Sequence, residues 1–161
     1  LNADRAALAV AHAAGCHFVR VDGWAADPSA AGRFHRYRQS LGDLVLPVLA
    51  DVRPHTADEV PALVAATEAA RPDALIVLGP SVGQSPQEGV VERACQETHL
   101  PLFCGGGLGA DNLHAFLDDA DGFLIGSGLK ENGRWQAPVC EGRVRALIGA
   151  VEYARGQEVR Q

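Results

Sequence analysis

Five short, continuous apolar runs constrain the fold of this chain more than any other feature. They occupy residues 17–22, 44–52, 74–79, 101–106 and 122–127. Because the runs are apolar throughout instead of alternating, both faces of each strand should be buried, as in parallel strands covered by helices. Helix-forming segments surround them at residues 4–14, 33–41, 58–70, 87–98, 111–117 and 141–154. This alternation predicts an α/β fold with a parallel sheet.

Two α/β architectures accommodate five such units. One is a doubly wound open sheet, and the other is part of a TIM (β/α)8 barrel, which takes about 250 residues in full. The chain has 161 residues and opens on a helical segment that no strand precedes. We therefore expect the C-terminal five βα units of a barrel, with the N-terminal three units absent, as a single partial barrel domain over residues 1–161. A doubly wound nucleotide-binding domain is disfavoured because no G-x-G-x-x-G follows the first run.

Composition excludes several classes of partner. The net charge is -6 and the 14 basic residues are scattered, so no nucleic-acid partner is expected. No apolar stretch approaches the roughly 18 residues of an integral membrane segment. The four cysteines are far apart and match no metal spacing, which favours a reducing, cytoplasmic location. Five units alone would leave two sheet edges open, so a longer chain or a homo-oligomer is expected to cover them.

Glycine clusters follow the last two strands, where a parallel sheet places its chemistry. Phosphate binding needs converging backbone N–H groups that side chains would obstruct. The predicted phosphate ligands are Gly105, Gly106, Gly107, Asn112, Gly126, Ser127, Lys130 and Ser81. The alternative is that these glycines only permit tight turns between strand and helix.

Charged residues end the first two strands. Asp22 and Asp51 each close an apolar run, and Arg53 and His55 follow the second. Two carboxylates at the mouth of a barrel are suited to general acid–base catalysis or to binding a divalent metal. His55 is suited to proton transfer, and Arg53 is suited to binding an anionic substrate. Each has a plainer explanation as a loop cap or a solvated charge. The sequence identifies no cofactor, although the two aspartates would suit a divalent metal.

Several segments together resemble the BtpA/SgcQ family. They include "HAAGCHFVRVD", "DALIVLGPSVGQ", "CGGGLGADN" and, most specifically, "DGFLIGSGLKENGRWQAPVCEGRV". The resemblance covers nearly the whole chain. It implies a TIM-barrel-like fold in a longer protein, with three further βα units upstream.

Two functions follow from the residues and the resemblance together. The first is a cytoplasmic enzyme that binds a small phosphorylated metabolite and performs isomerase or aldolase-like chemistry. The second, which the resemblance implies, is a non-catalytic assembly or stability factor of the photosystem I biogenesis type, peripheral to a membrane. Loss or retention of function on Asp51→Asn substitution would discriminate between them.

Overall fold

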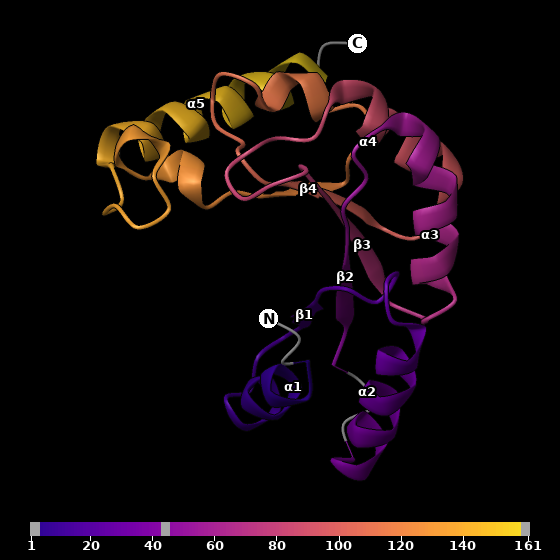
Figure 1. Ribbon diagram of the computed structural model, residues 1–161. Coiled ribbons are helices and arrows are strands. Elements are labelled where there is room, and N and C mark those ends of the chain that lie inside the picture. Colours follow the sequence, from indigo (N-terminus) through magenta and orange to yellow (C-terminus); the bar gives the residue numbers. More distant parts are fainter. Residues whose placement is uncertain (1–3, 43–45, 159–161) are drawn as a thin grey trace.

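The computed structural model describes residues 4–42 and 46–158 and contains one curved, five-stranded parallel sheet (Figure 1). Its strands are β1 (Val19–Val21), β2 (Val48–Val52), β3 (Ala74–Leu78), β4 (Leu102–Gly105) and β5 (Gly122–Leu124). The strands lie side by side in the order in which they follow along the chain, and each neighbouring pair is parallel. A doubly wound sheet instead reverses its strand order part of the way along. The sequential order therefore excludes the doubly wound alternative and leaves the arc of a barrel.

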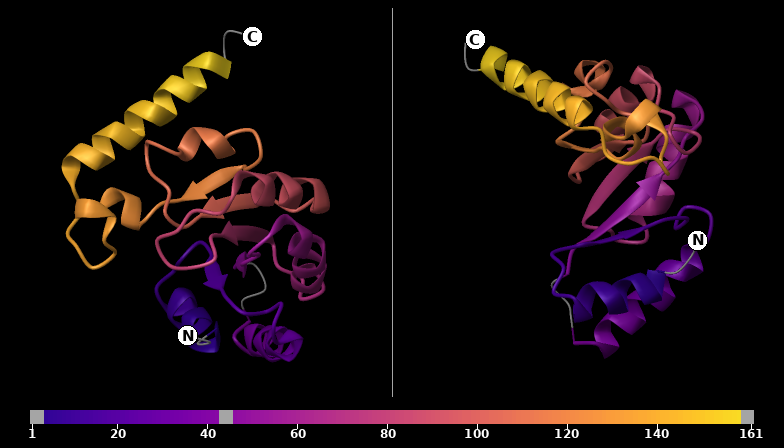
Figure 2. Two further views of the ribbon diagram at one scale, coloured as in Figure 1. Left: turned by 45° about the horizontal axis from the view of Figure 1, so that its top comes forward. Right: turned by 90° about the vertical axis from the view of Figure 1, so that its left-hand side faces the viewer.

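The helices α2, α3 and α4 cover the convex side of this arc, and α5 extends from its far end (Figures 1 and 2). The α-helices are α1 (Asp4–Ala13), α2 (Pro28–Ser40), α3 (Val60–Glu68), α4 (Glu88–Glu97) and α5 (Glu141–Glu158). Short 3-10 helices are η1 (Ala57–Glu59), η2 (Leu113–Phe116), η3 (Ser127–Leu129) and η4 (Glu131–Gly133). One side of the sheet is thus helix-covered along its length.

Alternate strand residues divide between the two faces of the sheet. The convex face packs Val52, Leu75 and Val77 against α3 and α4 through residues such as Val60 and Val90. The concave face carries a smaller apolar cluster of Leu49, Ala74, Ile76 and Leu78, with Phe103 and Leu124 beside it. Both faces of β3 are buried, which explains why its sequence is continuously apolar.

Aspartates fix the amino ends of two strand pairs. The carboxylate of Asp73 accepts a hydrogen bond from the Val48 N–H at 2.7 Å, and the Asp73 N–H donates to the Val48 carbonyl at 2.8 Å. Asp121 and Leu102 form the same reciprocal pair, with both bonds at 2.8 Å. Each aspartate stands one residue before a strand and locks it to the start of its neighbour, so it helps to set the register.

Most element boundaries differ by a few residues from the sequence-based ones: β1 and β5 are shorter than expected and α5 is longer. Three further differences concern residues 44–52, 111–117 and 33–41. The expected strand 44–52 begins only at Val48, because Pro47 has no N–H to donate; its carbonyl instead accepts the Val19 N–H at 2.8 Å. Residues 44 and 45 of that expected strand lie outside the described residues. The expected helix 111–117 is only the single turn η2. The expected helix 33–41 begins earlier, at Pro28, where Asp27 caps it and proline suits the first turn.

Candidate functional site

Charged side chains from the ends of β1 and β2 form a connected ion-pair cluster. Arg20 donates from Nε and Nη2 to the two carboxylate oxygens of Asp51, at 2.7 and 2.9 Å. Arg53 Nη2 donates at 3.1 Å to one oxygen of Asp22 and one of Asp51. Arg20 stands in register with Leu49, which shares its strand face with Asp51. The cluster therefore lies on the concave face, at the carboxyl end of the sheet.

Asp51 is the buried centre of this cluster. Its side chain is 2% exposed, whereas the side chains of Arg20 and Asp22 are 40% and 44% exposed. Burial raises the pKa of Asp51, and the hydrogen bond and charge of Arg20 oppose that rise. The same hydrogen bond raises the pKa of Arg20. Asp51 is thus placed to hold two guanidinium groups in position, and Asp22 is the carboxylate of the cluster that solvent reaches.

His55 stands apart from the other predicted residues of this group. Its side chain is exposed, and its backbone N–H donates to the Glu59 carboxylate at 2.8 Å. It lines neither of the two cavities described below. The structure therefore brings Asp22, Asp51 and Arg53 together but does not place His55 with them.

Close packing between loops accounts for two of the predicted phosphate-binding glycines. A Cβ atom on Gly106 would lie 2.7 Å from the carbonyl oxygen of Gln84, and one on Gly107 would lie 2.5 Å from that of Gly83. Both residues also have positive φ, at 88° and 58°, a conformation that favours glycine. The loop after β4 thus needs glycine at these two positions to pack against the loop after β3. This need is independent of any ligand.

The glycines at the other predicted positions have different surroundings. A Cβ on Gly105 would lie 2.9 Å from the side chain of Leu78, so this position is filled by the apolar cluster of the concave face. Gly128 is not one of the predicted ligands; a Cβ there would lie 1.8 Å from the Leu108 carbonyl oxygen. A Cβ on Gly126 would meet no atom within 4 Å. The packing of the described residues therefore does not require glycine at position 126, and the space beside its Cα atom is open.

The remaining predicted ligands are polar side chains of the same loops. Asn112 accepts the Gly109 N–H at 2.9 Å and donates to the Gly107 carbonyl at 3.2 Å, so it braces the glycine loop. The Ser81 hydroxyl donates at 2.6 Å to a glutamine of its own loop. Lys130 belongs to an antiparallel bridge in the segment after β5. Asn112 therefore stabilises the loop, and both its amide oxygen and its amide nitrogen already form hydrogen bonds.

Two adjoining cavities open among these loops. The first, of about 210 Å³, is lined in part by Arg20, Arg53, Gly106, Gly107, Gly126 and Ser127. The second, of about 400 Å³, is lined in part by Gly109, Gly128 and Arg143. Gly83, Gly107 and Ser127 line both cavities. The first cavity has two guanidinium groups and no carboxylate in its lining, so its charged side chains are all cationic.

Three residues that line these cavities were not among the predicted site residues. Arg20 could have been found from its place two residues before Asp22, because alternate residues share a strand face. Trp135 lines the first cavity and is 62% exposed. Arg143, in the first turn of α5, lines the second. No local signal identifies Trp135 or Arg143, since both reach the site through the fold of the segment after β5.

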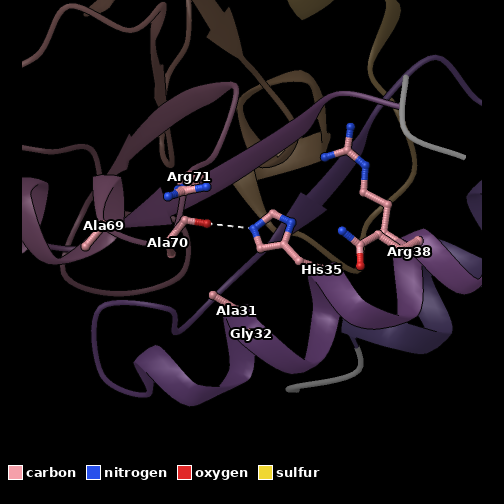
Figure 3. A pocket seen from close by; sticks show the side chains of 8 residues that line it. Ala31, Gly32, His35, Arg38, Ala69, Ala70 and Arg71 are labelled. Atoms are coloured by element: carbon pink, nitrogen blue, oxygen red, sulfur yellow. Dashed lines mark hydrogen bonds between the residues drawn. The ribbon is translucent and has the colours of Figure 1, made fainter.

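A further cavity, of about 530 Å³, lies between α2 and the end of α3 (Figure 3). His35 Nε2 bonds the Ala70 carbonyl across it at 2.7 Å, and the ring of His35 packs near Trp24 and Phe34. His35 thus joins two helical segments on the convex side.

Within residues 4–42 and 46–158, no three His, Cys, Asp or Glu side chains gather as a metal-binding group. Asp22 and Asp51, the predicted metal candidates, both accept hydrogen bonds from Arg53. In the same part of the chain, no helix is both long and apolar enough to cross a bilayer.

Solved TIM-barrel structures resemble this fold at low sequence identity. One is (S)-3-O-geranylgeranylglyceryl phosphate synthase from Thermoplasma acidophilum, in complex with its substrate sn-glycerol-1-phosphate. It matches with a TM-score of 0.55 and 13% identity, over 74% of this chain and 56% of its own. The YdjI aldolase from Escherichia coli matches with a TM-score of 0.54 and 18% identity, over 95% of this chain and 62% of its own. These likenesses confirm the barrel-type fold.

Two curated relatives have higher sequence identity to this chain than these solved structures do. An uncharacterized mitochondrial protein of Caenorhabditis elegans is 29% identical over 91% of this chain and 58% of its own length. The photosystem I biogenesis protein BtpA of Synechocystis is 31% identical over 93% of this chain and 57% of its own length. The chain thus spans less than two thirds of either relative. The model of the BtpA family matches residues 1–153, and the chain belongs to that family.

Proposed function

We propose that this protein binds a small phosphorylated metabolite at the carboxyl ends of its strands, as an enzyme with isomerase or aldolase-like chemistry. The observation that carries the proposal is the lining of the first cavity. This lining combines residues of the glycine-rich loops after β3, β4 and β5 with the guanidinium groups of Arg20 and Arg53, and it contains no carboxylate. Such a lining suits an anion with many acceptor oxygens.

The roles of individual residues follow from their exposure and partners. Backbone N–H groups around Gly106, Gly107, Gly126 and Ser127 would hold the phosphate. Asp22, as the exposed carboxylate, would accept or return a proton. Arg53, which lines the cavity, would stabilise negative charge that develops on the substrate. Asp51 would position the guanidinium groups.

Two solved structures of similar fold are consistent with this proposal. The synthase from Thermoplasma acidophilum is described in complex with sn-glycerol-1-phosphate, and the protein from Escherichia coli is an aldolase. At 13% and 18% identity they support the fold. The phosphate proposal therefore depends on the residues of this chain.

The test is thermal stabilisation of the intact protein by inorganic phosphate, with sodium chloride at matched ionic strength as the control. A ligand at tenfold excess over its Kd should stabilise the fold by roughly 1.4 kcal/mol. The variant Gly126→Ala places a methyl group in the open space and should weaken this stabilisation. Gly89→Ala, in α4 and also without a close neighbour, should leave it unchanged. Equal melting temperatures in phosphate and chloride would contradict the proposal.

A second function is favoured by one comparison. The relative from Synechocystis is named for photosystem I biogenesis, and a non-catalytic assembly factor would use the barrel as a binding surface. The exposed side chains of Val82 and Trp135, at 78% and 62%, would suit a protein contact at this face. Complementation of a deletion strain by Asp22→Asn distinguishes the two functions. The assembly factor should tolerate this substitution, whereas the enzyme should lose function.

A further inference from the structure

The two guanidinium groups of the ion-pair cluster have unused hydrogen-bond donors. Arg20 uses Nε and Nη2 for Asp51, and Arg53 uses Nε and Nη2 for Asp22 and Asp51. Within the described part of the chain, Nη1 of neither arginine donates a hydrogen bond. Each guanidinium carries five N–H donors, so both arginines keep N–H groups for another partner.

Both arginines line the first cavity, together with the glycine-rich loops. Arg20 belongs to β1 and Arg53 follows β2, whereas Gly106 and Gly126 follow β4 and β5. Since β2 and β4 are two strand spacings apart in the sheet, the two sides are separated by about 10 Å at the strand ends. A phosphate held by the glycine loops would therefore leave the guanidinium groups for the other end of the same ligand.

The carboxylates of the cluster fix the guanidinium groups without occupying the cavity. Asp51 is buried and binds both arginines, and neither Asp51 nor Asp22 lines the cavity. Fixed, planar donors favour a ligand group with two or more acceptor oxygens, and a charged acceptor forms the stronger hydrogen bonds. A hydroxyl group would satisfy fewer of these donors and would gain less.

We propose that the ligand carries a second anionic group, a carboxylate or a second phosphate, which Arg20 and Arg53 bind opposite the glycine-rich phosphate site. The substrate class is then a phosphorylated acid or a bisphosphate. This inference rests on the proposed function, because it takes the glycine loops as the site of the first phosphate.

The experiment compares dissociation constants by isothermal titration calorimetry on the intact protein, using ligand pairs that differ in one group. Glycerol 3-phosphate and 3-phosphoglycerate differ by a carboxylate, and fructose 6-phosphate and fructose 1,6-bisphosphate differ by a phosphate. Since hydrogen bonds to charged groups contribute about 1.5–3 kcal/mol, the doubly anionic member of at least one pair should bind about tenfold more tightly or better. The pair that shows the preference identifies the second group.

The variant Arg53→Gln tests whether the arginine causes the preference. It leaves the two-bond contact between Arg20 and Asp51 intact, so the fold should persist, as circular dichroism can verify. The preference should fall to about threefold or less, with inorganic phosphate binding unchanged within about twofold. Arg53→Lys, which keeps the charge but not the planar guanidinium, should retain part of the preference for the doubly anionic ligand. Arg145→Gln, which removes an exposed arginine paired with Glu141, should retain all of it.

Three outcomes would overturn the inference, and they are distinguishable. Equal affinity within both ligand pairs, with phosphate still bound, would remove the second anion site and leave the proposed function intact. Loss of inorganic phosphate binding in a folded Arg53→Gln protein would assign Arg53 to the first phosphate instead. Absence of phosphate binding by the unmodified protein would overturn both the inference and the proposed function.

Discussion

At the scale of single residues, Asp51 connects more of the candidate site than any other side chain described above. Its carboxylate binds Arg20 through two hydrogen bonds and Arg53 through a third, and it is nearly inaccessible to solvent. Two guanidinium groups from different strands would lose their common anchor without it. Its contribution should therefore be visible in stability as well as in ligand binding.

The substitution Asp51→Asn should lower the free energy of unfolding by about 1–3 kcal/mol. The neutral amide removes the charged acceptor from all three hydrogen bonds, and its NH2 group places a donor where a carboxylate oxygen accepted from a guanidinium. Urea denaturation followed by circular dichroism measures this change. Asp118→Asn, at an exposed position, is the matched control and should change stability by less than about 0.5 kcal/mol. Equal unfolding midpoints for the two variants would contradict this view of Asp51.

Cys104 should not react with alkylating reagents in the folded protein. It lies buried in β4, and burial raises the pKa of its thiol to about 12. The reactive thiolate is therefore scarce at about pH 8. Iodoacetamide should alkylate the exposed Cys16 and Cys95, and mass spectrometry should find Cys104 modified only after denaturant is added. Modification of Cys104 as fast as that of Cys95 would show that β4 opens readily.

At the scale of elements, the start of α2 depends on a charged cap. Asp27 accepts the Ser29 N–H at 3.0 Å and pairs with Arg33 at 2.9 Å. Hydrogen bonds from Ser29 and then Arg33 lower the pKa of Asp27. A carboxyl whose pKa is lower in the folded state stabilises the fold above its unfolded pKa, and this contribution is lost as the pH falls through the folded pKa.

The variant Asp27→Ala should therefore be less stable than the unmodified protein near neutral pH, and the difference should shrink below about pH 4. Thermal unfolding at a series of pH values measures it. Asp27→Asn keeps a capping oxygen without the charge. It should retain part of the stability, with less dependence on pH. A stability difference that grows on acidification would contradict the assignment of the cap.

Loop packing should distinguish glycines that look alike in the sequence. Gly128 stands where a Cβ would lie 1.8 Å from the Leu108 carbonyl oxygen, so Gly128→Ala forces the loops after β4 and β5 apart. The variant should be destabilised by about 1–3 kcal/mol in urea denaturation. Gly89→Ala in α4 has free space around it and should stabilise the helix by up to about 1 kcal/mol. Destabilisation of both variants to the same extent would contradict this distinction.

At the scale of the whole molecule, stability should be distributed unevenly along the arc. All five residues of β3 are buried, and this strand has β2 and β4 on either side. The helix α5 extends away from the sheet, and most of its described side chains are exposed or only partly buried (Figure 2). Hydrogen exchange followed by mass spectrometry should find the slowest amides in β3 and faster exchange in the second half of α5. Uniform protection across both segments would contradict this picture.

Much of this fold could be predicted from the sequence, because strands and helices depend on local pattern. The continuous apolar runs mark the five strands, since a strand buried on both faces must be apolar at every position. Their boundaries shift by a few residues, as at Pro47, which has no N–H to donate to a neighbouring strand. The positions of Asp22, Asp51 and Arg53 at strand ends were also visible, because strand ends can be read along the chain.

The partners of those residues required the tertiary structure. Arg20 and Asp51 are 31 positions apart in the chain and meet only because β1 and β2 are neighbours in register. The sequence could not show that Gly107 serves loop packing while Gly126 leaves open space, since both follow an apolar run. The sequence by itself determined the elements and their order, because backbone periodicity is local. The tertiary structure decided which residues face the cavity, because that depends on which distant loops come into contact.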